Sequence, residues 1–281
     1  MNLIDQTFAQ LKREGRSALM PFLTIGDPDL ETSLKIIKEV EAAGADLVEL
    51  GVPYSDPLAD GPVIQRASQR ALQQKVTIHD CIALAKRARA EGVKMPFVLF
   101  TYYNPILQLG PESFFQQLVD HEISGVIIPD LPYEEDDAVR TIAERYHIQF
   151  IPLVAPTSKE RIEKITSRAS GFIYCVSSMG VTGVRSEFAQ DIDEFLSTVK
   201  ASTDVPIAVG FGISNKDHVA RFTQICDGII VGSAIVREIE ANLALLQSTH
   251  GQQEGLANIR EFVANLKSGT DRAVVERVSS N

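Results

Sequence analysis

The chain has 281 residues, of which 44% are hydrophobic, and a formal net charge of -10. The hydrophobic fraction suffices for a large core without disulfides or structural metals. The negative charge argues against a nucleic-acid or anionic-membrane surface. The three cysteines lack metal-binding spacing, and the apolar runs are far shorter than the roughly 20 residues of a membrane span. We therefore expect a globular cytoplasmic protein, or a stromal one in a plastid-bearing source, although no transit peptide is visible.

The first predicted element is an amphipathic helix near the N-terminus. Ile4, Phe8 and Leu11 follow one another at i, i+4 and i+7 among polar residues. This spacing places them on one helix face and is not that of a signal peptide.

Eight short apolar runs follow, each succeeded by a turn and a stretch with helical periodicity. Such repetition is typical of βα units, and runs that are apolar on both faces are typical of parallel strands. We predict an α/β fold, a (β/α)8 TIM barrel with an extra N-terminal helix and additional helices, forming one domain over residues 1–268 with a polar, frayed tail over 269–281. The predicted strands are residues 18–24, 47–51, 97–101, 126–129, 149–154, 172–176, 207–210 and 228–231.

Helix-start signals support this division of the chain. Pro111 follows Gly110, and we expect helix caps at Thr157, from T-x-x-E, and at Ser214, from S-x-x-D. The segment between the second and third strands is too long for one helix, so an extra helix is expected after residues 56–61.

Carboxylates cluster where the second predicted strand ends, the edge that carries function in such barrels. Glu49 lies inside the apolar strand, where desolvation would raise its pKa toward the range useful for proton transfer. A structural ion pair explains a buried Glu equally well. Asp56 and Asp60 lie in a Pro/Gly-rich loop, where Asp is also a common turn residue.

Glycine-containing segments follow each of the last three predicted strands, at residues 180–183, 210–214 and 232–234. Glycine lets backbone N–H groups approach an anion, and a helix starting at Ser233 adds its positive dipole end. A single segment of this kind would merely permit a tight turn, but three together indicate a phosphate ester as ligand.

Residues 48–65 read V-E-L-G-V-P-Y-S-D-P-L-A-D-G-P-V-I-Q, which resembles the signature of tryptophan synthase alpha subunits. Further matches in the same order are P-F-L-T-I-G-D-P, Y-Y-N-P, P-D-L-P, G-V-T-G, G-F-G-I-S and G-S-A-I-V, and they extend over nearly the whole chain. The resemblance implies a carbon-carbon lyase that cleaves indole-3-glycerol phosphate to indole and glyceraldehyde 3-phosphate.

By this resemblance Glu49 and Asp60 match the catalytic carboxylates, with Glu49 moving protons and Asp60 accepting a hydrogen bond from the indole N–H. No metal or organic cofactor is implied for this chain. Pyridoxal phosphate belongs to the beta subunit, which would receive the indole in an α2β2 tetramer. The implied substrate-binding residues are Phe22, Leu99, Tyr102, Tyr174, Thr182, Gly183, Gly212, Gly232 and Ser233.

One departure concerns the segment before G-V-T-G, where the family often has an arginine and this chain has Ser178-Met179. The departure keeps open a stand-alone lyase that releases free indole without a beta partner. A second alternative is another phosphate-binding barrel enzyme, but residues 48–65 argue against it. A third is a non-catalytic subunit, and the presence of both Glu49 and Asp60 argues against that.

Overall fold

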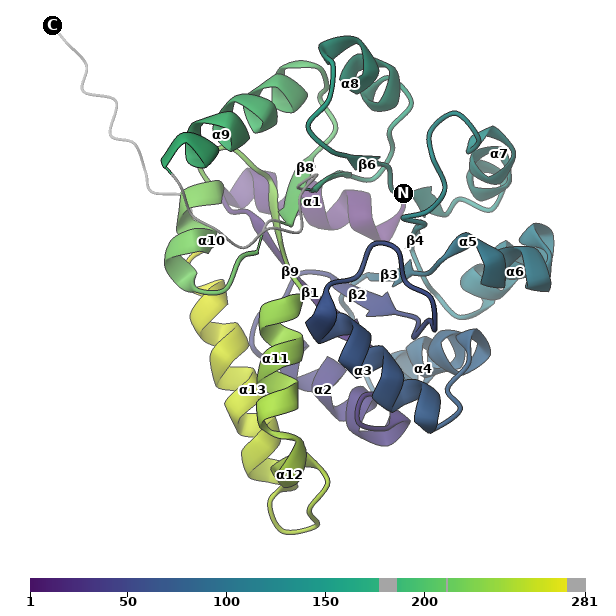
Figure 1. Cartoon of the computed structure of the whole chain (residues 1–281), viewed down its shortest axis with the longest axis vertical. Helices are drawn as coiled ribbons and strands as arrows, with labels where there is room; N and C mark the ends of the chain where they lie inside the picture. Colours follow the sequence, from purple (N-terminus) through teal and green to yellow (C-terminus); the bar gives the residue numbers. More distant parts are fainter. Residues whose placement is uncertain (177–185, 211, 272–281) are drawn as a thin grey trace, which may run out of the picture.

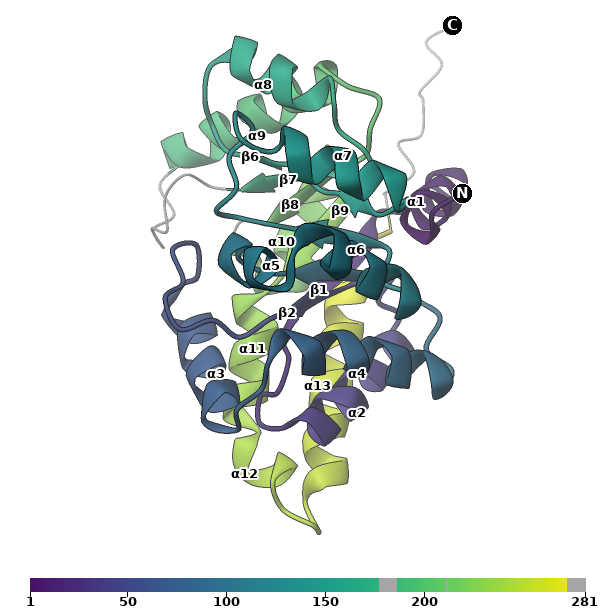
Figure 2. The same cartoon turned by 90° about the vertical axis from the view of Figure 1, so that its right-hand side faces the viewer.

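The computed structural model describes residues 1–176, 186–210 and 212–271. In this part of the chain the strands form one parallel sheet in the order β5-β4-β3-β2-β1-β9-β8-β7-β6, surrounded by helices (Figures 1 and 2). All eight predicted runs are strands, to within two residues at either end. The strands are β1 (Ala18–Thr24), β2 (Val48–Gly51), β3 (Phe97–Phe100), β4 (Gly125–Ile127), β5 (Gln149–Phe150), β6 (Leu153–Val154), β7 (Ile173–Val176), β8 (Ile207–Gly210) and β9 (Gly228–Val231).

The two ends of this strand order meet, because β5 and β6 are separated only by Ile151 and Pro152. The Ile151 N–H donates to the Val126 carbonyl at 2.9 Å, and the Pro152 carbonyl accepts from the Tyr174 N–H at 2.9 Å. Pro152 has no N–H to donate, which accounts for the interruption. The pair is one predicted strand in two halves, so the sheet closes as the predicted (β/α)8 barrel.

Alternate strand residues enter two different cores. Met20, Leu47 and Val98 lie in a cluster inside the barrel, whereas Leu19 and Leu50 pack in a second cluster with the surrounding helices. Burial of each such side chain stabilises the fold by about 1.5–3 kcal/mol.

The predicted N-terminal helix is α1 (Leu3–Glu14), and its buried face closes the N-terminal end of the barrel. Ile4, Phe8 and Leu11 join the cluster inside the barrel. Asn2 caps this helix by accepting from the Ile4 N–H at 2.9 Å.

The remaining helices include the extra one expected after residues 56–61, which is α3. No helix among the described residues is both long and apolar enough to cross a bilayer. The helices after α1 are α2 (Leu30–Ala42), α3 (Pro62–Gln73), α4 (Ile78–Ala90), α5 (Tyr103–Leu109), α6 (Pro111–Asp120), α7 (Asp137–Arg145), α8 (Lys159–Thr166), α9 (Ser186–Ala201), α10 (Lys216–Phe222), α11 (Ser233–Ala241), α12 (Leu243–Leu246) and α13 (Gln252–Lys267).

Two predicted helix caps are wrong by one residue. The cap of α8 is Ser158, not Thr157, and the cap of α10 is Asn215, not Ser214. In each case two adjacent residues carry a side-chain oxygen able to cap, and the residue that caps has an extended backbone and accepts from the N–H three residues later. The predicted start of α6 at Pro111 is confirmed.

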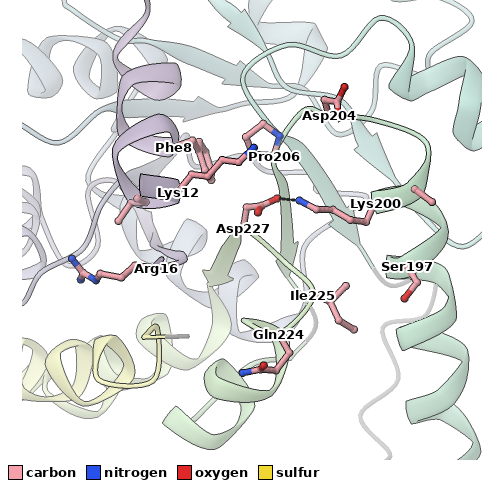
Figure 3. Close-up of a pocket in the computed structure, with 12 residues that line it drawn as sticks. Phe8, Lys12, Arg16, Ser197, Lys200, Asp204, Pro206, Gln224, Ile225 and Asp227 are labelled. Atoms are coloured by element: carbon pink, nitrogen blue, oxygen red, sulfur yellow. Dashed lines mark hydrogen bonds and ion pairs between the residues drawn. The ribbon is translucent and has the colours of Figure 1, made fainter. Parts of the chain in front are cut away.

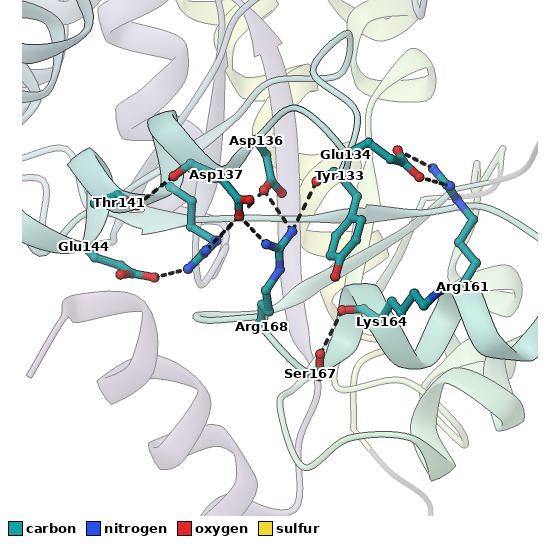
Figure 4. A network of polar contacts seen from close by, with 11 residues as sticks. Tyr133, Glu134, Asp136, Asp137, Thr141, Glu144, Arg161, Lys164, Ser167 and Arg168 are labelled. Carbon is teal, nitrogen blue, oxygen red and sulfur yellow. Dashed lines mark hydrogen bonds and ion pairs between the residues drawn. The ribbon is translucent and has the colours of Figure 1, made fainter.

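Acidic residues before and at the start of α7 join this helix to α8 (Figure 4). The Arg168 guanidinium donates to the carboxylates of Asp136, at 3.0 Å, and Asp137. Glu134 pairs with Arg161 on α8. These contacts, together with the favourable position of negative charge at a helix N-terminus, give the acidic run a structural role.

The described chain ends at the N-terminal end of the barrel. Thr270 is buried, and its carbonyl accepts from the Ser17 N–H at 3.2 Å. Asp271 pairs with Arg16 at 3.2 Å. Residues 272–281, most of the predicted polar tail, lie outside the described residues.

Candidate functional site

Glu49 lies in the middle of β2, paired in register with Phe22 of β1 and Val98 of β3. Its side chain faces the barrel interior, because Leu47, two residues earlier on the same face, lies in the interior cluster. The side chain is fully buried, and neither carboxylate oxygen has a hydrogen-bond partner among the described residues. Burial alone raises the pKa of Glu49 from 4.5 to about 8. Glu49 therefore forms no structural ion pair, the alternative explanation for this residue, with any residue that the structure describes.

Asp60 is half-buried on the loop that joins β2 to α3, and two contacts hold this part of the loop. The Gln65 side-chain amide on α3 donates to the Asp60 carbonyl at 2.8 Å. The Ala59 N–H donates to the Tyr102 hydroxyl at 3.1 Å. Tyr102 in turn stacks on Tyr54, with ring centroids 4.6 Å apart. The loop therefore has a defined position at the C-terminal end of the barrel.

The pKa of Asp60 is raised to about 6 by burial, an effect opposed by the nearby Tyr102 hydroxyl, which lowers this pKa. Asp56, four residues earlier in the same loop, is exposed and accepts a hydrogen bond from Ser55. The loop thus separates a half-buried carboxyl from a solvated one, as expected if Asp56 serves only the turn.

Tyr174 lies on β7, across the barrel from β2, and is near the two carboxyl groups. Its pKa lies well above 10, first because of burial and then because of the charges of Glu49 and Asp60. Gly210 of β8 leaves the room for its ring, since a Cβ there would lie 2.6 Å from Tyr174 Cε2. These three ionisable side chains therefore lie close enough together for their charges to interact.

Aromatic rings line the same end of the barrel. Phe22 contacts Phe100 edge to face, with ring centroids 5.5 Å apart. Gly51 permits this placement, because a Cβ there would lie 2.4 Å from Phe22 Cζ. The predicted pocket residues Phe22, Tyr102 and Tyr174 thus lie near the carboxyl groups.

The prediction for Leu99 needs correction. Leu99 packs in the cluster between the sheet and the helices, whereas Phe100 contacts the cluster inside the barrel. Successive strand residues point to opposite faces, so a shift of one position exchanges pocket and outer core. Phe100 is the residue of this strand end that contacts the barrel interior, which the sequence interpretation missed, and its alternation with Val98 was the available signal.

The predicted phosphate-binding residues lie at the ends of neighbouring strands. Gly212, two residues beyond β8, has φ +56°, and a Cβ there would meet nothing within 4 Å. Gly232 caps α11, whose first residue is Ser233. The surroundings of Gly212 are open, whereas a Cβ at Gly232 would contact Phe22 at 3.6 Å and Ile64 at 3.8 Å. The start of α11 at Ser233 places the positive dipole end of this helix at the same end of the barrel. The predicted residues Thr182 and Gly183, with the rest of segment 180–183 and Ser178-Met179, lie outside the described residues.

Two further features of the described chain lie away from the predicted site residues or concern metal binding. No group of three or more His, Cys, Asp or Glu side chains could hold a metal ion among the residues that the structure describes. A cavity of about 610 Å³ opens at the N-terminal end of the barrel, between α1, α9 and the starts of β8 and β9 (Figure 3). Its wall contains the Lys200–Asp227 ion pair and none of the predicted site residues.

Comparison with known proteins gives one consistent family. A family model described as tryptophan synthase alpha chain matches residues 8–270. The tryptophan synthase alpha chain of Geobacillus sp. strain WCH70 is 49% identical over 257 residues, covering 92% of this chain and 98% of the relative. That of Caldanaerobacter subterraneus is 46% identical over 267 residues, covering 95% and 99%.

Solved structures agree with these relatives. Tryptophan synthase subunit alpha from Legionella pneumophila superposes with a TM-score of 0.84 at 33% identity, covering 96% of this chain and 98% of that one. A chain of Mycobacterium tuberculosis tryptophan synthase gives a TM-score of 0.85 at 34% identity, with the same coverage. The chain therefore belongs to the tryptophan synthase alpha chain family.

Proposed function

We propose that this chain cleaves indole-3-glycerol phosphate by a retro-aldol reaction, giving indole and glyceraldehyde 3-phosphate. The observation that carries the proposal is the buried Glu49, which has no partner among the described residues, beside the half-buried Asp60. Both lie at the end of the barrel where loops carry function. Family membership supplies the substrate.

Glu49 is suited to move the protons of this reaction, because burial keeps it protonated at neutral pH. Its carboxyl group donates a proton to indole C3, which makes the ring an electron-poor indolenine. The bond from C3 to the glycerol side chain then breaks, and its electron pair returns to the ring. The carboxylate takes the proton of the adjacent hydroxyl group as the aldehyde forms, which restores protonated Glu49.

Asp60 is suited to stabilise the positive charge that develops on the indole nitrogen. With a pKa of about 6 it is mostly ionised at pH 7, and its carboxylate accepts a hydrogen bond from the indole N–H. Proton transfers alone complete this cycle, so we propose that the chain needs no metal or organic cofactor of its own.

We further propose that a beta subunit carrying pyridoxal phosphate receives the indole, in an α2β2 assembly. The alpha chain names of the relatives support this assignment over a stand-alone lyase. The test is indole release from indole-3-glycerol phosphate by the isolated protein, before and after addition of a beta subunit. Slow release with strong stimulation supports the subunit, fast release without stimulation supports the lyase, and no release in either case contradicts the activity.

Tyr102→Phe should shift the pH dependence of this reaction. The Tyr102 hydroxyl lowers the pKa of Asp60, so the loss of this hydroxyl raises that pKa above about 6. Because activity requires ionised Asp60, the acidic limb of kcat/KM should move to higher pH, with a several-fold larger loss at pH 6 than at pH 8. Tyr146→Phe, which alters a ring stacked on Phe115 away from the site, is the matched control. An unshifted acidic limb would show that Tyr102 does not influence Asp60.

Gly212→Val should raise KM for indole-3-glycerol phosphate at least tenfold. A valine side chain would fill the space where the phosphate would bind, and φ +56° is strained for a β-branched residue. Gly15→Val is the control for strain alone, because Gly15 has φ +67° and equally open surroundings at the C-cap of α1. Steady-state kinetics of both variants test this expectation, and an unchanged KM in Gly212→Val would show that the phosphate group does not bind at Gly212.

A further inference from the structure

Four charged residues form an ion-pair network between α3, α11 and the loop after β1. The Arg70 guanidinium donates two hydrogen bonds to the Asp27 carboxylate, at 2.7 and 2.8 Å, and a third to Glu240 at 2.9 Å. Arg66, one turn earlier on α3, donates two to Glu240, at 2.8 and 2.7 Å. The planar guanidinium group of arginine forms these paired hydrogen bonds, which fix the orientation of the two side chains as well as their separation.

Arg70 is the residue that connects all three elements. Asp27 is buried in the loop after β1, Glu240 lies in the last turn of α11, and Arg70 lies on α3 between them. Helices α3 and α11 lie side by side (Figures 1 and 2). Phe22 of β1, Ala67 of α3 and Val236 of α11 add an apolar contact among the same elements.

Each of the two helices leads from this network to a different half of the proposed site. Helix α3 begins at Pro62, two residues after Asp60, and its Gln65 holds the Asp60 carbonyl. Helix α11 begins at Ser233, at the proposed phosphate-binding end. An α-helix rises about 1.5 Å per residue, so Arg70 lies about 12 Å from the first residue of α3 and Glu240 about 10 Å from the first residue of α11.

We infer that Arg70 is a positioning residue that sets the separation between Asp60 and the phosphate-binding end of the barrel. The inference rests on the proposed function, because only a substrate that spans both halves senses this separation. Each half keeps its own contacts without Arg70, whereas their relative position depends on how α3 and α11 are joined. Displacement of reacting groups by about 1 Å can cost 10²-fold in rate.

The test uses the double variant Arg70→Met/Asp27→Asn in the full chain, because Arg70→Met alone would leave the buried Asp27 carboxylate unpaired and could prevent folding. A second variant, Glu240→Gln, weakens the contact with α11 and leaves the Arg70–Asp27 pair intact. Three quantities are measured after circular dichroism shows a folded protein: kcat/KM for indole-3-glycerol phosphate, its pH profile, and the inhibition constant of inorganic phosphate.

We expect kcat/KM to fall at least tenfold in the double variant and three- to tenfold in Glu240→Gln. The phosphate inhibition constant should stay within twofold of wild type and the acidic limb of the pH profile should not move, since each half of the site remains intact. Arg70→Lys, which keeps the charge but not the fork, should have a kcat/KM between those of the wild type and the double variant. Arg87→Met, which breaks the Arg87–Glu31 pair between α4 and α2, is the matched control and should change none of these values.

Three results would overturn the inference: an unchanged kcat/KM, a loss accompanied by an equal weakening of phosphate inhibition, or a loss accompanied by a shifted acidic limb. The second would mean a general structural role, and the third a direct effect on Asp60. Wild-type protein that releases no indole would instead refute the proposed function, and this inference with it.

Discussion

Glu49→Gln is expected to lower kcat/KM for indole release by about 10³-fold, since general acid–base groups contribute 10²–10⁴-fold. The amide fills nearly the same volume inside the barrel but cannot carry a proton to indole C3 or accept one from the hydroxyl group. Steady-state turnover of indole-3-glycerol phosphate checks the expectation. Glu254→Gln, an exposed position in the first turn of α13, is the control. Release of indole at more than about a tenth of the wild-type rate would remove Glu49 from the mechanism.

The same substitution should also change how stability depends on pH. Burial raises the pKa of Glu49 from 4.5 to about 8, so between these values the folded state holds a proton that the unfolded chain has released. The wild-type free energy of unfolding must therefore fall as pH rises through this range, by about 1.4 kcal/mol per pH unit from this group. Glu49→Gln lacks this dependence. In urea unfolding experiments, the free energy of unfolding of Glu49→Gln minus that of wild type should increase by roughly 2–3 kcal/mol between pH 5.5 and pH 7.5.

An unchanged stability difference between these two pH values would show that Glu49 is not buried and protonated as described. This measurement is independent of turnover, so it separates the environment of the carboxyl group from its role in the reaction.

Asp60→Asn should lower kcat about 10²–10³-fold, the usual cost of removing one preorganised electrostatic contact to a transition state. The amide can still form a hydrogen bond with the indole ring, but it lacks the negative charge that stabilises the indolenine nitrogen. The residual activity should also lose the acidic limb that wild type shows near pH 6, where Asp60 becomes protonated. Asp56→Asn, on the exposed part of the same loop, is the control. A variant that keeps the wild-type limb near pH 6 would assign that limb to another group.

Together the two carboxyl groups define a pH window. Ionised Asp60 and protonated Glu49 coexist between about pH 6 and about pH 8, because burial raises both pKa values but raises that of Glu49 further. Two carboxyl groups whose environments separate their pKa values can take the roles of acid and anion in one reaction. Maximal wild-type activity is therefore expected inside this window.

The main features of the fold were predictable from local patterns. The eight apolar runs correspond to the strands, and the spacing of Ile4, Phe8 and Leu11 defines the buried face of α1. These features depend on neighbours within a few residues, where period and turn chemistry are visible in the chain itself. Errors arose where adjacent positions were equivalent in type, as with Thr157 and Ser158.

The sequence by itself determined the barrel, the positions of Glu49, Asp60 and the glycines at strand ends, and the family. Only the tertiary structure decided that Glu49 has no ion-pair partner among the described residues, that Phe100 and not Leu99 contacts the barrel interior, and that Arg70 joins α3 to Asp27 and Glu240. Each of these depends on groups far apart in the chain. Burial and the meeting of distant charges are set when the sheet closes, so no local pattern encodes them. The alternation of Val98 and Phe100 shows that these two residues share a strand face, but only the closed sheet decides that this face lies inside the barrel.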